Sequence, residues 1–595
     1  MSVVRDTVVD MPPRESPSPR WCAVGRSGTA PGGLAAVELD ESGGRSPEIP
    51  IPADGLANFV AAREAEAPRR WVWADTPAVY PALLTAGVRV ERCHDLRLCH
   101  QILRNSVLVR DRAALHAATQ WAVAPDPVEE PRAPLMPALF ELEAGSARRP
   151  TVPDSLSEVL AEFDRQRSAI DSAAEPNRIA LLLAAESVGA LIAVELTSAG
   201  VPWDTEEHDR ILSEALGPRP APGAKPAALL AVGEEVRAAL GDPSASLDSP
   251  PKLLRALRAA GIEASSTSRW ELAEHEHPAI PPLLHYKKLA RLLSANGWNW
   301  LDEWVRDGRY RPVYVPGGVV TGRWASSGGG ALQIPRSLRP ALRADPGCLL
   351  VSADVSQLEP RVLAAMSGDR AMAAAGAGRD LYAGIVESGA VATRQDAKIA
   401  VLGAMYGGTS GDSGRLVPRL RRAFPAAMRL VDDAAAIGEQ GGIVTTWLGR
   451  SSPPPGEEWQ GVQAAASLPG AGRREEEHAR RIAREFGRFT RNFVVQGTAA
   501  EWALAWMGEL RRRLFAFDPV HGETPMAASG PVFSARPHLA FFLHDEVIVH
   551  APRAHAEAVA SAIEESAQAA GRLLFGDAPV DFRLDLRISE RALKD

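Results

Sequence analysis

The chain has 595 residues, of which 46% are hydrophobic and 24% are charged, and its net charge is −8. Single hydrophobic cores stop growing at roughly 250–300 residues, so this length excludes a one-domain protein and predicts two to four domains. The composition is ordinary for a globular protein, and the acidic balance excludes a uniformly basic nucleic-acid-binding chain, so any basic footprint must be local.

The N-terminal residues Met1–Asp6 contain no apolar signal core, and no uninterrupted run in the chain reaches about 18 apolar residues. We therefore expect a soluble, cytoplasmic protein with no membrane partner. The cysteines form no Cys-x-x-Cys pair and are too few for a disulfide framework; they are Cys22, Cys93, Cys99 and Cys348. Buried thiols are the expected state, and a zinc site from Cys93-His94 and Cys99-His100 is an alternative whose spacing matches no common zinc finger.

Three proline-rich stretches predict loops or linkers, because proline removes a backbone donor and disfavours helix. They are residues 124–134, 217–223 and 452–456. Residues 282–293 alternate leucines with basic side chains such as Lys287 and Arg291, which predicts an amphipathic helix with a basic outer face. That face could bind a phosphate backbone or could be a plain solvated surface.

A strand followed by a helix is predicted around Asp354. The apolar run Cys348–Ala353 predicts the strand, and Leu358, Val362 and Met366 recur at helical spacing. Asp354 is therefore expected at the point where the strand ends and the connection to the helix begins.

A second helix is predicted from Arg394 towards Tyr406-Gly407. Arg394 and Lys398 stand four residues apart, so both lie on one helical face, and two cations there suit a triphosphate. As a pair without context they could equally be exposed surface residues.

A dense run of arginines begins at Arg473. If the segment is helical, Arg480, Arg484, Arg488 and Arg491 share one face. This face could contact nucleic acid, and a solvated helix surface is the alternative.

A hairpin is predicted over residues 541–550, since apolar runs flank the polar tip His544-Asp545-Glu546. Asp545, like Asp354, lies where a strand stops. Two carboxylates at converging strand ends can hold two divalent cations about 3.5–4 Å apart, the arrangement that clamps the attacking and leaving oxygens in phosphoryl transfer. The residues therefore predict a nucleotidyl transferase.

Six motifs in order resemble the polymerase domain of the family A DNA polymerases, the DNA polymerase I type, from about Arg178 to the C-terminus. They are Thr321-Gly-Arg-Trp-Ala-Ser-Ser327 with Leu332-Gln-Ile-Pro335, Asp354-x-Ser-Gln-x-Glu-x-Arg361, Arg394-x-x-x-Lys398 with Tyr406-Gly407, Gly442-x-Val-x-Thr-x-x-Gly-Arg450, Arg488-x-x-x-Asn492-x-x-x-Gln-Gly-Thr-Ala-Ala500 and His544-Asp-Glu546. Any one could arise by chance, whereas six in the right order are specific.

The resemblance implies an α+β multidomain fold. This is a right-hand polymerase with an antiparallel palm sheet and helical fingers and thumb, preceded by a ribonuclease H-like α/β exonuclease-like domain. The implied boundaries are 1–177 for the exonuclease-like domain, 178–310 for the thumb, 311–375 and 490–595 for the palm, and 376–489 for the fingers. We expect no separate 5′ nuclease domain of the kind found in longer relatives.

The same resemblance implies a two-metal site. Asp354, Asp545 and the backbone carbonyl of Val355 would bind two Mg²⁺ ions, for which Mn²⁺ can substitute. Magnesium prefers hard oxygen ligands and keeps several waters, so two carboxylates and triphosphate oxygens suffice. Lys398 would act as general acid on the departing pyrophosphate, and Glu546 is a further catalytic candidate beside Asp545.

The resemblance also implies which residues contact nucleotide and DNA. The incoming nucleotide would be bound by Arg394, Lys398, Tyr406, Glu359, Gln357 and Tyr382, with Glu359 beneath the sugar excluding a 2′-hydroxyl. The DNA would be bound by Arg323, Arg488, Asn492, Gln496 and His544. Minor-groove acceptors are shared by all correct base pairs, so hydrogen bonds to them test fit without reading sequence; Gln357, Arg323, Asn492 and Gln496 are the candidates for such bonds.

Three positions depart from the family pattern. Val355 replaces the usual tyrosine, Leu402 stands where phenylalanine or tyrosine is normal, and Tyr382 takes the place of a histidine that often follows Asp380 by two residues. These departures bear on sugar discrimination, nucleotide affinity and rate rather than on metal binding.

The N-terminal third matches the family's exonuclease pattern poorly. Residues 34–40 lie where the first strand should carry Asp-x-Glu, but the order here is Glu38-x-Asp40. Asp75 and the pair His94-Asp95 can be matched to the next acidic segment, and residues 181–186 lack the third motif, Tyr-x-x-x-Asp. Because two-metal hydrolysis needs its ligands, we expect this domain to be inactive.

The sequence thus predicts a template-directed DNA polymerase that adds deoxynucleotides to a primer 3′ end by two-metal phosphoryl transfer, in DNA repair or replication. Expected partners are primer–template DNA and deoxynucleoside triphosphates, and a nucleoid-associated monomer is expected. Two alternatives stay open: a bifunctional polymerase with an active 3′-5′ exonuclease, and a catalytically silent DNA-binding scaffold.

Overall fold

The computed structural model describes residues 20–28, 32–41, 43–123, 151–408, 411–521, 524–543 and 545–593. These residues form two compact units: unit 1 runs to Val123 and resumes up to Val188, and unit 2 begins at Gly189. The linker predicted at 124–134 lies outside the described residues. The boundary predicted after residue 177 falls inside helix α6, and the predicted domain limits stay predictions.

Unit 1 is built on a mixed five-stranded sheet of order β3-β2-β1-β4-β5. Central β1 pairs antiparallel with β2 and parallel with β4. Helix α5 packs on β1, and the core includes Trp121 and Phe163. The elements are β1 (Trp21–Arg26), β2 (Leu34–Leu39), β3 (Ile49–Ile51), α1 (Leu56–Glu66), β4 (Arg70–Trp73), α2 (Thr76–Thr85), β5 (Arg92–Asp95), α3 (Leu96–Asn105), α4 (Ala113–Ala117) and α5 (Leu156–Asp171).

Helix α6 (Pro176–Ala199) contains the point at which the two units are divided. It is long and apolar enough to cross a membrane, but 78% of its apolar window is buried inside the structure, as in the core helix of a soluble protein. Length and composition alone are therefore weak evidence for a membrane span.

The centre of unit 2 is a four-stranded antiparallel sheet of order β12-β13-β11-β14. Its strands are β11 (Cys348–Val355), β12 (His538–Leu543), β13 (Glu546–Pro552) and β14 (Leu584–Ser589). Every residue of β13 is buried, because it lies between β11 and β12 and helix α21 (Ala556–Phe575) packs against it. The predicted strand ending near Asp354 and the predicted hairpin are both confirmed.

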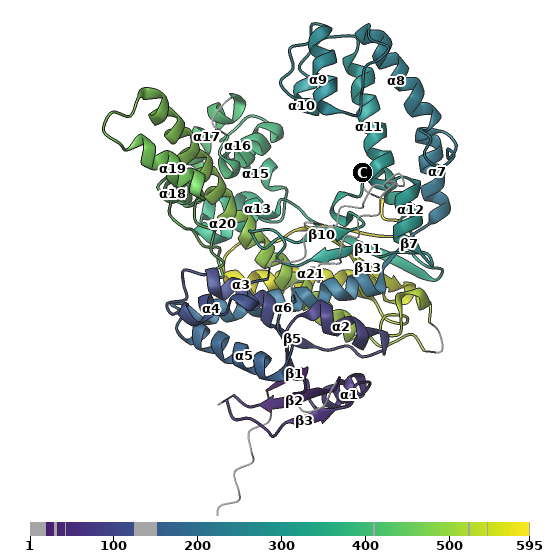
Figure 1. The fold of residues 1–595 in the computed structure, drawn as a ribbon, viewed down its shortest axis with the longest axis vertical. Coiled ribbons are helices and arrows are strands. Elements are labelled where there is room, and N and C mark those ends of the chain that lie inside the picture. The colour runs from purple at the N-terminus through teal and green to yellow at the C-terminus, as the bar shows by residue number, and fades with distance from the viewer. Residues whose placement is uncertain are drawn as a thin grey trace, which may run out of the picture. The chain divides into compact units, whose positions relative to one another are not determined.

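One group of helices in unit 2 follows β11, and its buried core includes Tyr382, Val401 and Phe424. Most of these helices, and the 43-residue helix α20, are labelled in Figure 1. They are α13 (Leu358–Ser367), α14 (Arg370–Gly376), α15 (Leu381–Glu387), α16 (Arg394–Tyr406), α17 (Gly411–Ala423), α18 (Pro425–Glu439), α19 (Glu457–Ala466) and α20 (Arg473–Phe515). The predicted helices after Ser356 and from Arg394 are confirmed, and the arginine-rich segment from Arg473 is helical.

A second group of helices in unit 2 precedes the sheet in sequence and has its own apolar core around Leu257 and Tyr286. It comprises α7 (Thr205–Leu216), α8 (Ala227–Leu240), α9 (Pro250–Ala259), α10 (Arg269–Leu272), α11 (Ile280–Asn296) and α12 (Trp298–Trp304). Helix α11 contains the amphipathic segment predicted at 282–293. The proline-rich stretches 217–223 and 452–456 are loops that precede α8 and α19.

Short strands complete unit 2, namely β6 (Val201–Pro202), β7 (Val305–Arg306), β8 (Arg309–Tyr310), β9 (Val313–Val315) and β10 (Ala325–Gly328). The predicted α+β multidomain fold, with an antiparallel sheet and helical groups preceded by an α/β unit, is confirmed. All four cysteines are free and buried, and the described residues contain no cluster of three or more side chains that could hold a metal ion.

Candidate active site

Asp354 and Asp545 lie on neighbouring strand ends of the unit 2 sheet. In the antiparallel register of β11 and β13, Asp354 stands opposite Glu546. One residue further, the backbone N–H of Val355 donates to the carbonyl oxygen of Asp545 at 3.0 Å. Both aspartates are partly exposed. The structure therefore places the backbones of Asp354 and Asp545, which the sequence separates by nearly 200 positions, side by side at one sheet edge.

A buried ion pair stabilises the hairpin that carries Asp545. The guanidinium of Arg339 donates to both carboxylate oxygens of Glu546, at 2.7 and 2.6 Å, and it lies over the ring of Phe541. The two side chains are only 4% and 6% exposed. Glu546 therefore supports the hairpin in this conformation, and its predicted catalytic role stays a prediction.

An aromatic cluster fixes the preceding strand, β12. The Tyr314 hydroxyl donates to the carbonyl of Phe542 at 3.0 Å and accepts from its N–H at 3.2 Å. Trp324 packs against both rings, with centroids 5.4 Å from Tyr314 and 5.1 Å from Phe542. This packing leaves Asp545 little freedom to leave the sheet edge.

A cavity of about 310 Å³ opens beside Asp545. Five predicted site residues line it: Arg323, Gln357, Glu359, Tyr382 and Asp545. Its other walls are mostly apolar and include small and aliphatic residues of α20, namely Ala499, Ala500, Ala503, Leu504 and Met507. A mostly apolar cavity with a few convergent polar groups is the usual form of a small-molecule site.

Glu359 joins two other predicted residues on the wall of this cavity. It pairs with Arg323 and accepts a hydrogen bond from the Tyr406 hydroxyl at 2.6 Å. Burial and the bond to Glu359 raise the pKa of Tyr406 to about 12, so the phenol stays protonated near neutral pH. The hydroxyl is therefore available as a donor, and it holds the carboxylate in a fixed place.

Arg394 is held at the start of α16 by Asp380. Its Nε and Nη2 atoms donate to the Asp380 carboxylate at 3.2 and 2.7 Å, and its guanidinium lies 5.6 Å from the centre of the Tyr382 ring. Lys398, one turn further, is exposed and makes no ion pair within the described residues. The two cations predicted to share a helical face do so.

Helix α20 carries the remaining predicted residues. Arg488 is exposed, and its side chain packs closely against Gly407. A Cβ at position 407 would lie 2.5 Å from Cγ of Arg488. Asn492 and Gln496 are half-buried, and Gln496 interacts with the Tyr406 hydroxyl. Arg491 differs from Arg480, Arg484 and Arg488, because it is turned into a contact with Asp432 and the carbonyl of Ala404. His544 lies outside the described residues.

A glycine on α20 allows two loops to approach the site. A Cβ on Gly497 would stand 2.3 Å from Thr446 Cγ2 and 3.1 Å from the carbonyl oxygen of Thr321. Glu501, one turn along, accepts hydrogen bonds from Thr446 Oγ1 and from the N–H of Leu448. The sequence motif Gln-Gly-Thr-Ala-Ala thus has a packing reason, in that small residues let the helix pass under both loops.

The three departures from the family pattern occupy different environments. Val355 is fully buried in the sheet, so its side chain does not reach the cavity. Leu402 and Tyr382 both line the cavity. Burial, with the nearby charge of Glu359, raises the pKa of Tyr382 to about 12. Tyr382 therefore presents a neutral phenol where the family often has an imidazole.

Sequence reasoning missed four residues of this neighbourhood. Arg339 and Tyr314 lie in no recognised motif, Asp380 was noted only as part of the Asp380-x-His pattern, and Asp585 stands opposite Asp354 on β14. Alternation of apolar residues around 584–589 is the only signal that could have indicated β14, because the segment carries no other distinguishing feature.

The donor set fits divalent cations of the hard type. Two aspartates lie on adjoining strand ends of one sheet edge, and the backbone carbonyl of Val355 follows the first of them, so all donors are oxygens. Magnesium accepts such a set and completes its coordination with waters and substrate oxygens. Asp354, Asp545 and Val355 are thus suitable metal ligands by chemistry, and their predicted role stays a prediction.

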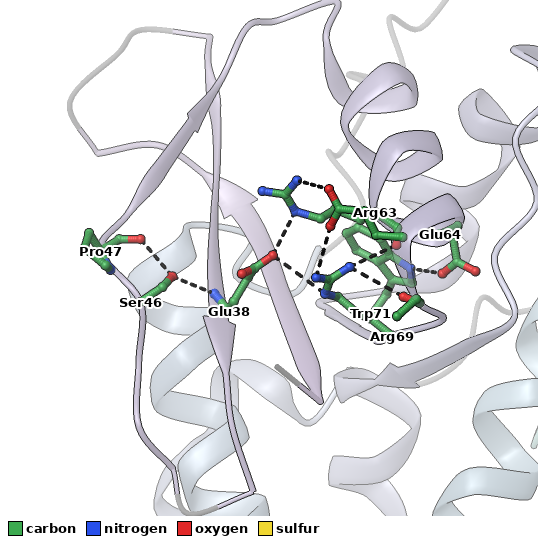
Figure 2. Close-up of polar contacts among 9 residues, drawn as sticks. Glu38, Ser46, Pro47, Arg63, Glu64, Arg69 and Trp71 are labelled. Carbon is green, nitrogen blue, oxygen red and sulfur yellow. Dashed lines mark hydrogen bonds and ion pairs between the residues drawn. The ribbon is translucent and has the colours of Figure 1, made fainter. Parts of the chain in front are cut away.

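The carboxylates of unit 1 are arranged differently. Figure 2 shows Glu38 between Arg63 and Arg69; Arg63 Nε donates to its carboxylate at 2.8 Å, and Arg69 Nε forms an ion pair with it at 3.7 Å. Asp75 pairs with Arg97 at 2.7 Å. Asp95 caps α3 by accepting from the N–H of Leu98 at 2.9 Å. These side chains are already bound to cations or to helix ends.

The strand assignment in unit 1 requires a correction. Residues 34–39 form β2, whereas the sequence placed them on the first strand; the first and central strand is β1, Trp21–Arg26, which carries no acidic residue. The short run Trp-Cys-Ala-Val was overlooked because a strand buried on both faces shows no polar alternation. The first strand therefore offers no carboxylate of the Asp-x-Glu kind.

Comparisons with known proteins agree with this geometry. The model of DNA polymerase family A matches residues 255–590, more than half of the chain. DNA polymerase I of Chloroflexus aurantiacus is 31% identical over 340 residues, covering 52% of this chain and 32% of that protein. The thermostable DNA polymerase I of Thermus aquaticus is 26% identical, covering 51% and 36%. The chain spans about a third of the length of these relatives.

A solved structure shows the same fold. The polymerase domain of Pol1 from M. smegmatis, in complex with DNA primer-template and dNTP, superposes with a TM-score of 0.64. The alignment covers 96% of this chain and 95% of that one at 17% sequence identity. At this identity the likeness speaks for the fold.

Proposed function

This chain belongs to family A of the DNA polymerases, and we propose that it is a template-directed DNA polymerase that adds deoxynucleotides to a primer 3′ end. The observation that supports the proposal is that Asp354 and Asp545 stand on adjoining strand ends, and that Asp545 lines a cavity together with Arg323, Gln357, Glu359 and Tyr382.

In this proposal the metal ligands are Asp354, Asp545 and the carbonyl of Val355. Family A polymerases use divalent metal ions, and two bound Mg²⁺ would lower the pKa of the primer 3′-hydroxyl and neutralise the charge that builds on pyrophosphate. The protein needs no nucleophile of its own, because the attacking hydroxyl belongs to the primer.

The cationic residues of α16 would hold the triphosphate. Arg394 offers a planar fork that matches phosphate oxygens, and Lys398 offers a mobile ammonium that can also give its proton to the departing pyrophosphate. Glu359 and Tyr406 would pack beneath the sugar, held together by their hydrogen bond, and Glu359 would exclude an added 2′-hydroxyl. This would make deoxynucleotides the preferred substrates.

The DNA would lie against α20 and the loop of Arg323. Gln496 and Asn492 are half-buried amides on the face of α20 that also carries the small residues of the cavity. The M. smegmatis neighbour was solved with primer–template and dNTP, which supports these two partners for the present chain. We further propose a monomer that acts on DNA in the cytosol, in repair or replication.

Two other functions make different predictions. A silent scaffold would have lost the costly charged groups first, yet Asp354, Asp545, Arg394 and Lys398 are all present. A proofreading enzyme would need a carboxylate on the first strand of unit 1, and β1 has none. We therefore propose that unit 1 is an inactive exonuclease-like domain.

The test is primer extension on a labelled primer–template with deoxynucleotides and either Mg²⁺ or Mn²⁺. We expect the label to move to longer products, and the Asp545→Ala variant to give none. Absence of extension by the wild-type protein at every metal concentration would support the scaffold. Shortening of the primer that persists in Asp545→Ala and disappears in Glu38→Gln would support the exonuclease.

A further inference from the structure

Asp380 occupies the junction of three structural elements beside the cavity. It caps helix α15, where its Oδ1 accepts from the N–H of Ala383 at 2.8 Å. The same carboxylate binds Arg394 of α16 and accepts from Gln357 Nε2 at 3.0 Å. Gln357 follows Asp354 by three residues and lines the cavity. Asp380 therefore connects the end of the metal-binding strand to the arginine of α16.

The ion pair orients the guanidinium without using all of it. Asp380 engages the Nε and Nη2 side of Arg394, and Nη1 lies outside this pair. The ring of Tyr382 lies beneath the same guanidinium, 5.6 Å from its carbon to the ring centre. An arginine held on one edge and supported on one face can still offer its remaining donors to a phosphate. Loss of the edge contact would leave an exposed, freely rotating side chain.

Gln357 fixes Asp380 from the opposite side. Its Oε1 accepts from the N–H of Leu381 at 3.2 Å, so both ends of the amide bind the start of α15. Gln357 itself adopts a left-handed backbone conformation with φ of 54°, which costs about 1 kcal/mol or more for a residue other than glycine. The structure accepts this strain at the point where the strand turns towards Asp380.

We propose that Asp380 is a positioning residue for nucleotide binding, which holds Arg394 in the orientation that receives the triphosphate. The inference rests on the proposed polymerase function and deepens it. Although burial opposes ionisation, the hydrogen bonds from Arg394 and Ala383 keep the pKa of Asp380 below its usual range. The carboxylate is therefore charged at neutral pH, as a partner of Arg394 must be.

The test compares steady-state primer extension by the wild type, Asp380→Asn, Arg394→Ala and the double variant. Asparagine keeps the capping oxygen for α15 but cannot form a charge-assisted pair, so stability should change little. We expect KM for the deoxynucleotide to rise about tenfold in Asp380→Asn while kcat changes less than about threefold. In the double variant we expect KM within about twofold of Arg394→Ala alone, since both changes remove one interaction.

A matched control comes from a neighbouring helix cap. Asp369 caps α14 by accepting from the N–H of Met372 at 3.0 Å, its other oxygen accepts from the N–H groups of Ala426 and Ala427 at the start of α18, and neither oxygen binds Arg394. Asp369→Asn should leave KM unchanged, which separates loss of orientation from loss of a cap. An unchanged or lowered KM in Asp380→Asn overturns the inference, as do additive effects in the double variant. No extension by the wild type overturns the polymerase function and this inference together.

Discussion

The two units of this protein both place carboxylates near strand ends, but they treat them in opposite ways. In unit 1, Glu38 and Asp75 are bound by arginines that belong to their own sheet and helices. In unit 2, the buried guanidinium of Arg339 binds Glu546, the neighbour of Asp545, and Asp545 itself lines a cavity. The same residue type is thus part of the scaffold in one unit and of a candidate site in the other.

The role of a carboxylate in this protein therefore depends on which cation the fold places beside it. An arginine that fills the space around Glu38 satisfies the charge and leaves no position for a metal ion. At the sheet edge of unit 2, Arg339 pairs with Glu546 and so holds the neighbouring residue, Asp545, in place. Four predictions follow from this contrast, beginning with the one of largest effect.

The strongest test replaces the strand-end aspartate itself. Asp354→Asn keeps the shape of the side chain and removes its charge, so we expect primer extension to fall by about a thousandfold or more. Asp585→Asn is the matched control, since Asp585 stands opposite Asp354 on β14 and is largely exposed. Extension by Asp585→Asn should stay within about threefold of wild type, as measured in single-turnover assays. Equal losses in both variants would mean that the sheet edge, not one carboxylate, matters.

Removal of the supporting arginine should chiefly cost stability. Arg339→Ala leaves Glu546 buried without its partner, and breaking such a pair costs about 3–5 kcal/mol. Calorimetry should show a lower transition temperature for unit 2, whereas Arg63→Ala, whose pair with Glu38 is partly exposed, should shift the unit 1 transition much less. Similar shifts in both variants would remove the contrast between the units.

Acidic pH should destabilise each unit through its buried histidines, of which His94 in unit 1 and His538 in unit 2 are the probes; burial also lowers the pKa of His550 and His208 in unit 2. Burial lowers the pKa of His94 in unit 1 and of His538 in unit 2 to about 4, against about 6.5 in an unfolded chain. Between these values the unfolded chain binds more protons, so stability is complete above pH 6.5 and falls as pH decreases towards 4. At pH 5 each histidine should cost about 2 kcal/mol, measured by denaturant unfolding.

Replacement of each histidine shows which unit responds. His94→Gln should weaken the pH dependence of unit 1 alone, and His538→Gln should weaken that of unit 2 alone, where His550 and His208 still contribute. A pH dependence unchanged by either replacement would assign the effect to other groups.

The smallest effect is expected at Glu38. Its carboxylate is 15% exposed and its partner Arg63 is 24% exposed, so Glu38→Gln should lower the stability of unit 1 by only about 1 kcal/mol. Neither primer extension nor the length of an unextended primer should change. A loss of 3′ shortening in this variant would instead make Glu38 a catalytic ligand.

Much of the unit 2 site could be predicted from sequence because its signals are local. Each signal depends on residues that are close in the chain: the apolar run before Asp354, the four-residue spacing of Arg394 and Lys398, and the polar tip of the hairpin. Periodicity and turn chemistry therefore placed both aspartates at strand ends correctly. In unit 1 the same rules missed β1, because a short strand buried on both faces has no distinguishing alternation.

From the sequence alone it could be predicted that a strand ends near Asp354, that a hairpin carries Asp545 and that a helix begins at Arg394, since these features follow from neighbouring residues. Only the tertiary structure decided which charges meet. Arg339 and Glu546 are 207 residues apart, and Arg491 lies on the same face of α20 as Arg488 yet is half-buried and paired with Asp432. The partners of an ion pair depend on how elements distant in sequence pack together, and a local sequence pattern does not contain that information.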